Sequence, residues 1–422
     1  MKQYWEFVMK IIGIFFCMLS LNLHGNSDKY DVFNLTDADI ATTLNNSIVV
    51  SAPNNKKLTA DITFGCADIK YKNGVLKFCE CGDGICMSLR PTWIDINGTK
   101  QWLTAPYWGI FWHYLAQFKL PMWLVGDAGP LNAYALSTLA LCGGKNVRTI
   151  ADLERDITFK ALRSSNSKPS KNIRDYKGIV VYRSVSGRDS ALFKRFKKMY
   201  PEFLFVNNHT VDDITNKERT YQAFCAAGMH RYVPLSQKYS TVYSKELVQS
   251  ILQNIATDKL VVKPEHCSLA CGVNVIDRAD LDALLSLILK NKNQIKRDAH
   301  RCFAYWRNAK DRAFFVQEYA SSKLLVKDNK TYDPTMRIVF FMHHDQEKIT
   351  VTVVGGFWKI PVKPLEDPQA SLTEKHVTIA HAGAYYTGML CDRNDWREIE
   401  KCLHEALPAL YGAMMQRFTK AL

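Results

Sequence analysis

The sequence predicts an α/β protein, and three observations support that fold class. Strand-like and helix-like segments alternate along the middle of the chain, which is typical of parallel strands covered by helices. The composition, 47% hydrophobic and 23% charged, is that of a globular protein and excludes a disordered chain, a collagen and a coiled coil. The length of 422 residues is enough for two to three domains of roughly 150 residues each.

The first half of the chain predicts a hairpin, a helix and an alternating layer. Residues 28–60 carry few periodic signals and predict a loop-rich lead-in. Residues 61–90 predict a β-hairpin, because Asn73-Gly74 separates two runs of alternating hydrophobicity. An aromatic-rich helix is expected within 101–119. The alternating layer follows, with strands at 121–126, 178–184 and 203–208 and helices at 131–142, 190–200 and 216–228.

The second half predicts a mixed α+β region and a helical tail. Residues 241–365 hold two amphipathic helical segments, KELVQSILQNIA and DLDALLSLILKN. Residues 395–418 predict a final helix. The strands of the mixed region are KLVVKP, VNVI, AFFVQEYA, TMRIVFFMHH and ITVTVVGGFWKI.

The N-terminal segment, 1–27, is apolar and has three interpretations. A run of 13 residues, Ile11 to Leu23, follows Lys2 and Lys10 and resembles the hydrophobic region of a signal peptide. It is shorter than the ~20 residues of a membrane span. A cleaved export signal, a membrane anchor or buried helix, and a misassigned start codon therefore all stay open.

The cysteines indicate a different cellular location for the protein from the one that the N-terminal segment suggests. Several of the twelve cysteines, such as Cys142 and Cys402, lie inside apolar runs, where a reduced thiol packs as a small hydrophobe. Reduced thiols favour the cytoplasm, whereas a signal peptide favours export, so localisation stays open. The cluster between Cys66 and Cys86 lacks zinc-knuckle spacing, which favours packed thiols over a zinc site.

The charge is strongly basic. Lys and Arg number 55 against 41 Asp and Glu, giving a formal net charge of +14. A basic surplus suits phosphate-bearing ligands, nucleic acid or anionic lipid. Nucleic acid is not expected as a partner, because no dense Lys/Arg block with interleaved aromatic residues occurs in the sequence.

The segment 259–276, KLVVKPEHCSLACGVNVI, is a candidate phosphate site. An apolar strand delivers Lys263, and a loop of small residues that includes Ser268 and Gly272 follows. Small residues let backbone amides close over phosphate oxygens, and the lysine adds a positive charge. The segment matches neither a Walker loop nor a dinucleotide fingerprint, and a surface hairpin with a turn lysine is the alternative.

The context of Lys263 resembles a known family. Lys217 opens a helix, VVKP and the small-residue loop follow, and a strand ends in Gln-Glu-Tyr at 317–319. This order resembles the nucleotide half of ATP-grasp enzymes such as D-alanine–D-alanine ligase and glutathione synthetase. The resemblance implies that Lys217 and Lys263 hold ATP phosphates and that Ser268 to Gly272 cover them. It also implies an adenine cleft lined by Gln317, Glu318 and Tyr319.

Carboxylates for magnesium are expected in the N-terminal hairpin, since the last hundred residues lack the family's metal motif. Asp68 and Glu80 lie on the two hairpin strands and can share a sheet face; simple alternation places Glu80 with Phe78. This order resembles glutathionylspermidine synthase and other circularly permuted ATP-grasp proteins. Gly82 stands where the family has Asn, and Asp83 is a substitute ligand. A solvated hairpin with ordinary surface acids is the alternative.

Two cations from later strands complete the candidate site. Arg337 is expected to stabilise a charged acyl phosphate or its tetrahedral adduct, and Lys359 to contact phosphate or substrate. Their alternatives are a buried structural Arg–Asp pair and an exposed lysine on a bulged strand. His376 and His381 flank a small-residue loop and are candidates for a substrate contact.

The resemblance implies an ATP-dependent carboxylate–amine ligase that uses ATP and Mg²⁺ and proceeds through an acyl phosphate. Its substrates would be small-molecule or peptide carboxylates and amines, with membrane association only through the N-terminal segment. The alternatives are a non-catalytic nucleotide-binding or interaction protein on an ATP-grasp scaffold, and an ATP-dependent phosphotransferase. The expected divisions are the apolar segment 1–27, the hairpin and aromatic helix 28–120, a Rossmann-like layer 121–210, the ATP-grasp nucleotide-binding region 211–395 and a C-terminal helix 396–422.

Overall fold

The computed structural model describes most of the chain. The N-terminal segment 1–27, Ser268 and His381 lie outside the described residues. None of the helices within the described ranges is both long and apolar enough to cross a membrane. The described residues are 29–30, 37–52, 59–85, 93–96, 99–102, 104–126, 133–160, 169–182, 189–208, 214, 216–265, 270–296, 301–378 and 385–421.

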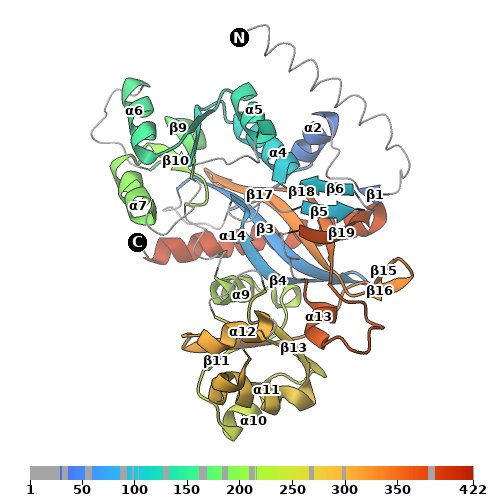
Figure 1. The fold of residues 1–422 in the computed structure, drawn as a ribbon. Helices are drawn as coiled ribbons and strands as arrows, with labels where there is room; N and C mark the ends of the chain where they lie inside the picture. The colour runs from blue at the N-terminus through green and yellow to red at the C-terminus, as the bar shows by residue number, and fades with distance from the viewer. Residues whose placement is uncertain are drawn as a thin grey trace.

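A large sheet forms the centre of the molecule (Figure 1). Its strands run in the order β4-β3-β17-β18-β19-β5-β6, with β1 on β19 and β2 on β18, and every pairing is antiparallel except that of β19 with β5. The hairpin from early in the chain therefore pairs with strands from its last hundred residues. The strands are β1 (Lys29–Tyr30), β2 (Ile48–Ser51), β3 (Asp61–Lys72), β4 (Val75–Asp83), β5 (Trp93–Ile96), β6 (Thr99–Trp102), β17 (Thr335–Asp345), β18 (Lys348–Ile360) and β19 (Tyr385–Asp392).

The hairpin predicted around Asn73-Gly74 is confirmed. β3 pairs with β4 in antiparallel register, and the two turn residues have φ of 50° and 78°. Positive φ at both central positions is the requirement of a type I′ turn, and Asn-Gly meets it with little strain. The local sequence therefore sets this connection.

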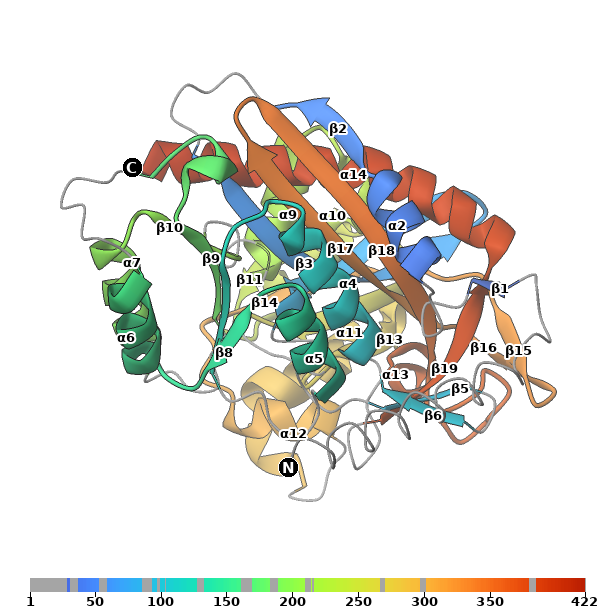
Figure 2. The same cartoon turned by 90° about the horizontal axis from the view of Figure 1, so that it is seen from above.

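Helices cover both faces of the large sheet (Figures 1 and 2). On one face, α4 (Thr104–Ala116) packs Trp108, Phe111 and Trp112 against Phe64 in a core where all four are at most 1% exposed. On the other face, α14 (Arg393–Ala421) and α9 (Lys217–Ala226) share a core with the odd-numbered residues of β3. The predicted C-terminal helix is thus confirmed.

Residues 28–60 contain more regular secondary structure than their sequence pattern predicts. A helix, α2 (Asp37–Asn45), and strand β2 occupy part of 28–60, so the expectation of loops alone is wrong there. α2 is short and polar, and its Ile40 is buried in the core beside α4. Tertiary packing against β18 stabilises it, because a nine-residue helix is marginal alone.

A second sheet contains the predicted parallel strands. Its order is β10-β9-β7-β8 and all three pairings are parallel, as the alternating pattern predicts. Trp123, Val180 and Phe205 form its core with residues from the adjacent helices. The elements are β7 (Met122–Val125), α5 (Ala133–Leu141), β8 (Lys145–Val147), α6 (Ile150–Lys160), β9 (Gly178–Tyr182), α7 (Asp189–Met199) and β10 (Phe203–Phe205).

A third sheet forms a separate lobe below the large sheet in Figure 1. Its order is β11-β14-β12-β13, all antiparallel, and its own core centres on Leu260, Phe314 and Trp306. α13 lies between this lobe and the large sheet, and a small β15–β16 hairpin projects at the side of the large sheet in Figure 1. The elements are β11 (Ser236–Ser240), α10 (Lys245–Asn254), β12 (Lys259–Pro264), β13 (Asn274–Asp277), α11 (Leu281–Leu285), α12 (Arg301–Asn308), β14 (Ala313–Glu318), β15 (Leu325–Lys327), β16 (Lys330–Tyr332) and α13 (Leu372–His376).

Candidate functional site

An open cleft lies between the small antiparallel sheet and the large sheet. It encloses about 760 Å³ when the solvent space at its mouth is counted. Its lining comes from β3, β4 and β18 on one side and from β12, β13 and β14 on the other. The predicted site residues that line it are Asp68, Glu80, Lys217, Lys263, Gln317, Glu318, Tyr319, Lys359 and His376.

A β-bulge brings Asp68 and Glu80 onto one face. The register pairs Asp68 with Glu80 but Ile69 with Phe78, so Cys79 is the extra residue. Without this bulge, Asp68 would pair with Cys79 and Glu80 would point to the opposite face. The simple alternation that places Glu80 with Phe78 is therefore wrong: Phe78 packs in the core against Phe224, whereas Glu80 lines the cleft.

Asp68 is held by two cations from neighbouring strands. Its carboxylate accepts from Arg337 Nε at 2.9 Å and Nη2 at 3.0 Å, and from Lys359 Nζ at 2.7 Å. The strand register explains this geometry. Asp68 on β3 pairs directly with Arg337 on β17, and Lys359 lies two residues beyond Phe357, the β18 partner of Arg337. Burial acts to raise the pKa of Asp68, but the Arg337 and Lys359 cations outweigh it and hold this pKa well below its usual range. Arg337 thus forms a buried pair with Asp68.

Glu80 is the more accessible carboxylate. Its side chain is 34% exposed and lies 3.5 Å from Lys217 Nζ. Lys217 is the first residue of α9, whose N-cap Asn216 accepts a hydrogen bond from Arg219 N. This cap fixes the start of the helix and hence the position of the lysine over the hairpin.

Lys263 reaches the same hairpin from the opposite lobe. It lies on β12, is 8% exposed, and donates from Nζ to the Cys79 carbonyl at 3.2 Å. About 185 residues separate Lys263 from the hairpin in sequence, yet the bulge and the lysine meet across the cleft. Burial raises the pKa of the neighbouring Cys79 thiol, so this thiol is neutral beside the Lys263 cation.

The Gln317–Tyr319 segment runs along the back of the cleft. Gln317 pairs with Val261 and Glu318 with Leu260, and Tyr319 N donates to Lys259 O at 3.2 Å. Glu318 also forms an ion pair with Lys77 of β4 at 3.4 Å. This ion pair ties the small sheet to the β3–β4 hairpin.

Gly272 closes the loop after β12 without lining the cleft. Its φ is +74°, and a Cβ atom there would lie 2.4 Å from Pro264 Cγ. Trp306 Nε1 donates to its carbonyl at 2.8 Å. Glycine is thus required for both backbone conformation and close packing, while Ala270 of the same loop lines the cleft.

Asp83 is not brought to the cleft. Its side chain accepts from Ile85 N at 2.9 Å and from Asn207 Nδ2, and the residue is 7% exposed. Three residues along a strand amount to roughly 10 Å and reverse the face. The expectation that Asp83 substitutes as a metal ligand therefore conflicts with this geometry.

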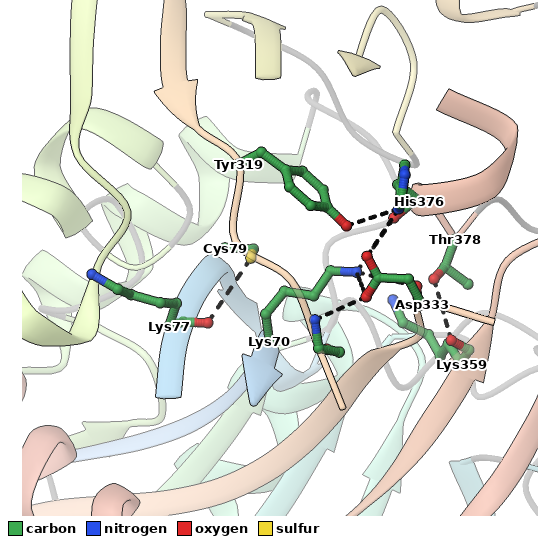
Figure 3. A network of polar contacts seen from close by, with 9 residues as sticks. Lys70, Lys77, Cys79, Tyr319, Asp333, Lys359, His376 and Thr378 are labelled. Atoms are coloured by element: carbon green, nitrogen blue, oxygen red, sulfur yellow. Dashed lines mark hydrogen bonds and ion pairs between the residues drawn. The ribbon is translucent and has the colours of Figure 1, made fainter. Parts of the chain in front are cut away.

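A polar network that the motifs did not predict lies beside these residues (Figure 3). Asp333, 1% exposed, binds Lys70 Nζ at 3.0 Å and His376 Nδ1 at 2.9 Å, and its Oδ1 accepts from Ser322 N at 2.9 Å. Tyr319 Oη lies 2.8 Å from His376 Nδ1. Burial acts to raise the pKa of Asp333, but Lys70 and these hydrogen bonds lower it overall. The sequence feature that could have identified Lys70 as a site residue is the alternation of β3, which places Lys70 on the same face as Asp68.

The donor set fits Mg²⁺ through few protein ligands. Within the described ranges, no group of three or more His, Cys, Asp or Glu side chains is placed to hold a metal. Magnesium commonly takes only one or two carboxylates and completes its octahedron with phosphate and water. Glu80 forms one long ion pair, so most of its acceptor sites are available to a metal. The carboxylate of Asp68 has roughly four acceptor sites, and its three hydrogen bonds leave about one of them available. Glu80 is accordingly the primary candidate ligand and Asp68 a secondary one.

No protein-family model and no curated protein sequence matches the chain. Among solved structures, the D-cycloserine synthetase DcsG is 14% identical with a TM-score of 0.36, covering 71% of this chain and 82% of its own. The VanG D-Ala:D-Ser ligase from Enterococcus faecalis is 15% identical with a TM-score of 0.34, covering 70% and 83% respectively. The D-alanine–D-alanine ligase from Coxiella burnetii is 10% identical with a TM-score of 0.28, covering 72% and 97%. All three TM-scores lie below 0.5, so function is inferred from the residues of the cleft.

Proposed function

We propose that the protein is an ATP-dependent carboxylate–amine ligase of the ATP-grasp type, with its metal hairpin placed before its nucleotide lysines by circular permutation. The observation that carries this proposal is the meeting of Lys263 and the bulged Asp68–Glu80 hairpin in one cleft. Such a cleft offers cations for phosphates beside a carboxylate for magnesium, which is the set that phosphoryl transfer requires.

ATP binds with its base at the strand end formed by Gln317 to Tyr319 and its phosphates toward Lys217 and Lys263. Both lysines line the cleft and approach the hairpin from different elements. Glu80 would hold Mg²⁺, with Asp68 as the second carboxylate. When bound, the metal supplies charge neutralisation at the phosphate oxygens.

Arg337 and Lys359 act at the acyl centre. Their side chains are 14% and 3% exposed and both contact Asp68. Phosphorylation of the substrate carboxylate gives an acyl phosphate, and amine attack then forms a tetrahedral adduct carrying an oxyanion. Preoriented cations stabilise that developing charge without reorganising, and Asp68 keeps both side chains oriented.

A non-catalytic nucleotide-binding protein is the second candidate. The observation that favours it is the double pairing of Asp68, which leaves Glu80, of the two carboxylates on the hairpin, with most of its oxygen capacity available. Such a protein would bind ATP without turning it over.

One experiment separates the two candidates. The purified chain is incubated with ATP, Mg²⁺ and a fractionated pool of small metabolites and peptides, and ADP, phosphate and new masses are measured. A ligase releases ADP and phosphate and yields a product lighter by one water than its two substrates combined. A binder gains thermal stability with ATP without turnover. Absence of both stabilisation and turnover would reject the nucleotide site itself.

A further inference from the structure

His376 lines the cleft and pairs with the buried Asp333, and neither residue has a part in holding ATP or metal. His376 is the last residue of α13, which is fixed by a capping box between Ser371 and Glu374. Thr373 on the same helix accepts from Val275 N at 2.9 Å, and Thr378 donates to the Lys359 carbonyl at 3.4 Å. The histidine is thereby anchored to both lobes.

The contacts define the protonation of the imidazole. Nδ1 lies 2.9 Å from Asp333 Oδ2 and 2.8 Å from the Tyr319 hydroxyl. An anionic carboxylate is the stronger acceptor, so Nδ1 carries the proton and Nε2 carries the lone pair. Among the described residues, Nε2 makes no hydrogen bond, although the side chain is 10% exposed and lines the cleft.

A buried ion pair lies beside His376. Within the described residues, the titratable side chains in contact with His376 are Asp333, Tyr319 and Lys70, whose Nζ is 3.5 Å from the His376 carbonyl. Lys70 pairs with Asp333 at 3.0 Å and so offsets the negative charge that the histidine faces. The arrangement resembles the buried-carboxylate support of a general base.

We propose that His376 is the general base for the incoming amine and that Asp333 is its positioning residue; this inference rests on the proposed ligase function. The amine enters as an ammonium and gives one proton to Nε2. Its lone pair then attacks the acyl phosphate carbonyl, and the C–N bond forms. The C–O bond to phosphate breaks, and the second amine proton leaves with the inorganic phosphate.

The test compares His376→Asn with His230→Asn, a control at an exposed histidine outside the cleft. Asn keeps an N–H donor near the position of Nδ1 and removes the base. Each variant receives ATP, Mg²⁺ and a mixture of the twenty amino acids as carboxylates and amines, with or without hydroxylamine. Hydroxylamine is mostly unprotonated near pH 7 and needs no base to expose its lone pair.

We expect His376→Asn to lose amide formation by roughly 10²–10⁴-fold, the usual contribution of a general base, and to keep hydroxamate formation and ATP affinity. His230→Asn should match the wild type. Amide formation unchanged in His376→Asn would overturn the inference, as would a raised KM for ATP at unchanged kcat, which would place His376 on the nucleotide. If the wild type yields neither amide nor hydroxamate, the proposed function falls and the inference with it.

A measurement without substrate separates failure of the inference from failure of the ligase function. Nitrogen NMR of the His376 ring should show the proton on Nδ1 and the lone pair on Nε2. Asp333→Asn should shift the tautomer balance, whereas a merely structural pair would leave the Nε2 resonance unmoved. A ring protonated on Nε2 in the neutral state would overturn the inference even if the protein ligates.

Discussion

Replacing Asp68 by Asn removes the anion that holds Arg337 and Lys359. The three hydrogen bonds, of 2.7, 2.9 and 3.0 Å, are all charge-assisted, and the three side chains are at most 14% exposed. The Asn oxygen still accepts from one cation, so about two bonds at ~1.5 kcal/mol are lost. The resulting ~3 kcal/mol agrees with the lower end of the roughly 3–5 kcal/mol cost of breaking a buried pair.

The assay is denaturant unfolding followed by tryptophan fluorescence, with and without ATP. We expect the midpoint of Asp68→Asn to fall at unchanged slope without ligand and to recover partly with ATP, whose phosphates replace the missing anion. Asp282→Asn, which breaks an exposed pair with Lys245, is the matched control and should leave the midpoint unchanged. Unchanged ligand-free stability of Asp68→Asn would refute the view that Asp68 orients these cations.

The pH dependence has a defined sign. The pKa of Asp68 is lower in the folded protein than the unfolded value of about 3.9. The stabilisation from Asp68 is therefore complete above that unfolded pKa and is lost as the pH falls toward the folded pKa. Acid unfolding of the wild type should show this loss, and the stability difference between wild type and Asp68→Asn should shrink at acid pH.

Three further predictions concern the cleft and its loop. Lys263→Ala should weaken ATP binding roughly tenfold to a hundredfold, since a charged hydrogen bond contributes ~1.5–3 kcal/mol; calorimetry showing unchanged affinity in a folded variant would contradict the assignment. Glu80→Gln should abolish Mg²⁺-dependent turnover while ligand-free stability stays near that of the wild type, whereas full turnover would remove Glu80 from the metal site. Gly272→Ala should destabilise the fold by at least ~1 kcal/mol, because its φ is +74° and its Cβ would meet Pro264, and an unchanged melting temperature would argue against that strain.

Local patterns predicted those parts of the fold in which neighbouring residues decide the structure. Asn73-Gly74 predicted the hairpin because its turn needs positive φ at two successive residues. The alternating segments predicted parallel strands, which the β10-β9-β7-β8 sheet contains. The helix α2 was missed because its own sequence is weakly helical and its packing on β18 supplies the stability.

Motif order likewise predicted several of the residues that meet in the cleft. Lys217, Lys263 and Tyr319 were predicted because each ends or begins an element in a recognisable sequence context. Asp333 had no such context, since the tertiary pairing with Lys70 and His376 gives it its place. Asp83 was misplaced because a linear motif does not show which face of a strand a residue occupies.

By itself the sequence determined the hairpin, the strand that carries Lys263 and the glycine that closes its loop, because each depends on local backbone preferences. Only the tertiary structure decided that Cys79 bulges, and hence that Glu80 faces Asp68 rather than the opposite side of the sheet. Only the tertiary structure also decided that Asp68 is shared by Arg337 and Lys359, since β3 must pair in one register with the distant strands β17 and β18 before these charges meet. Side chains along a strand alternate between the two faces of a sheet, so a single inserted residue reverses the face of every residue beyond it. The position of that inserted residue depends on the strand register, which is a property of the assembled sheet.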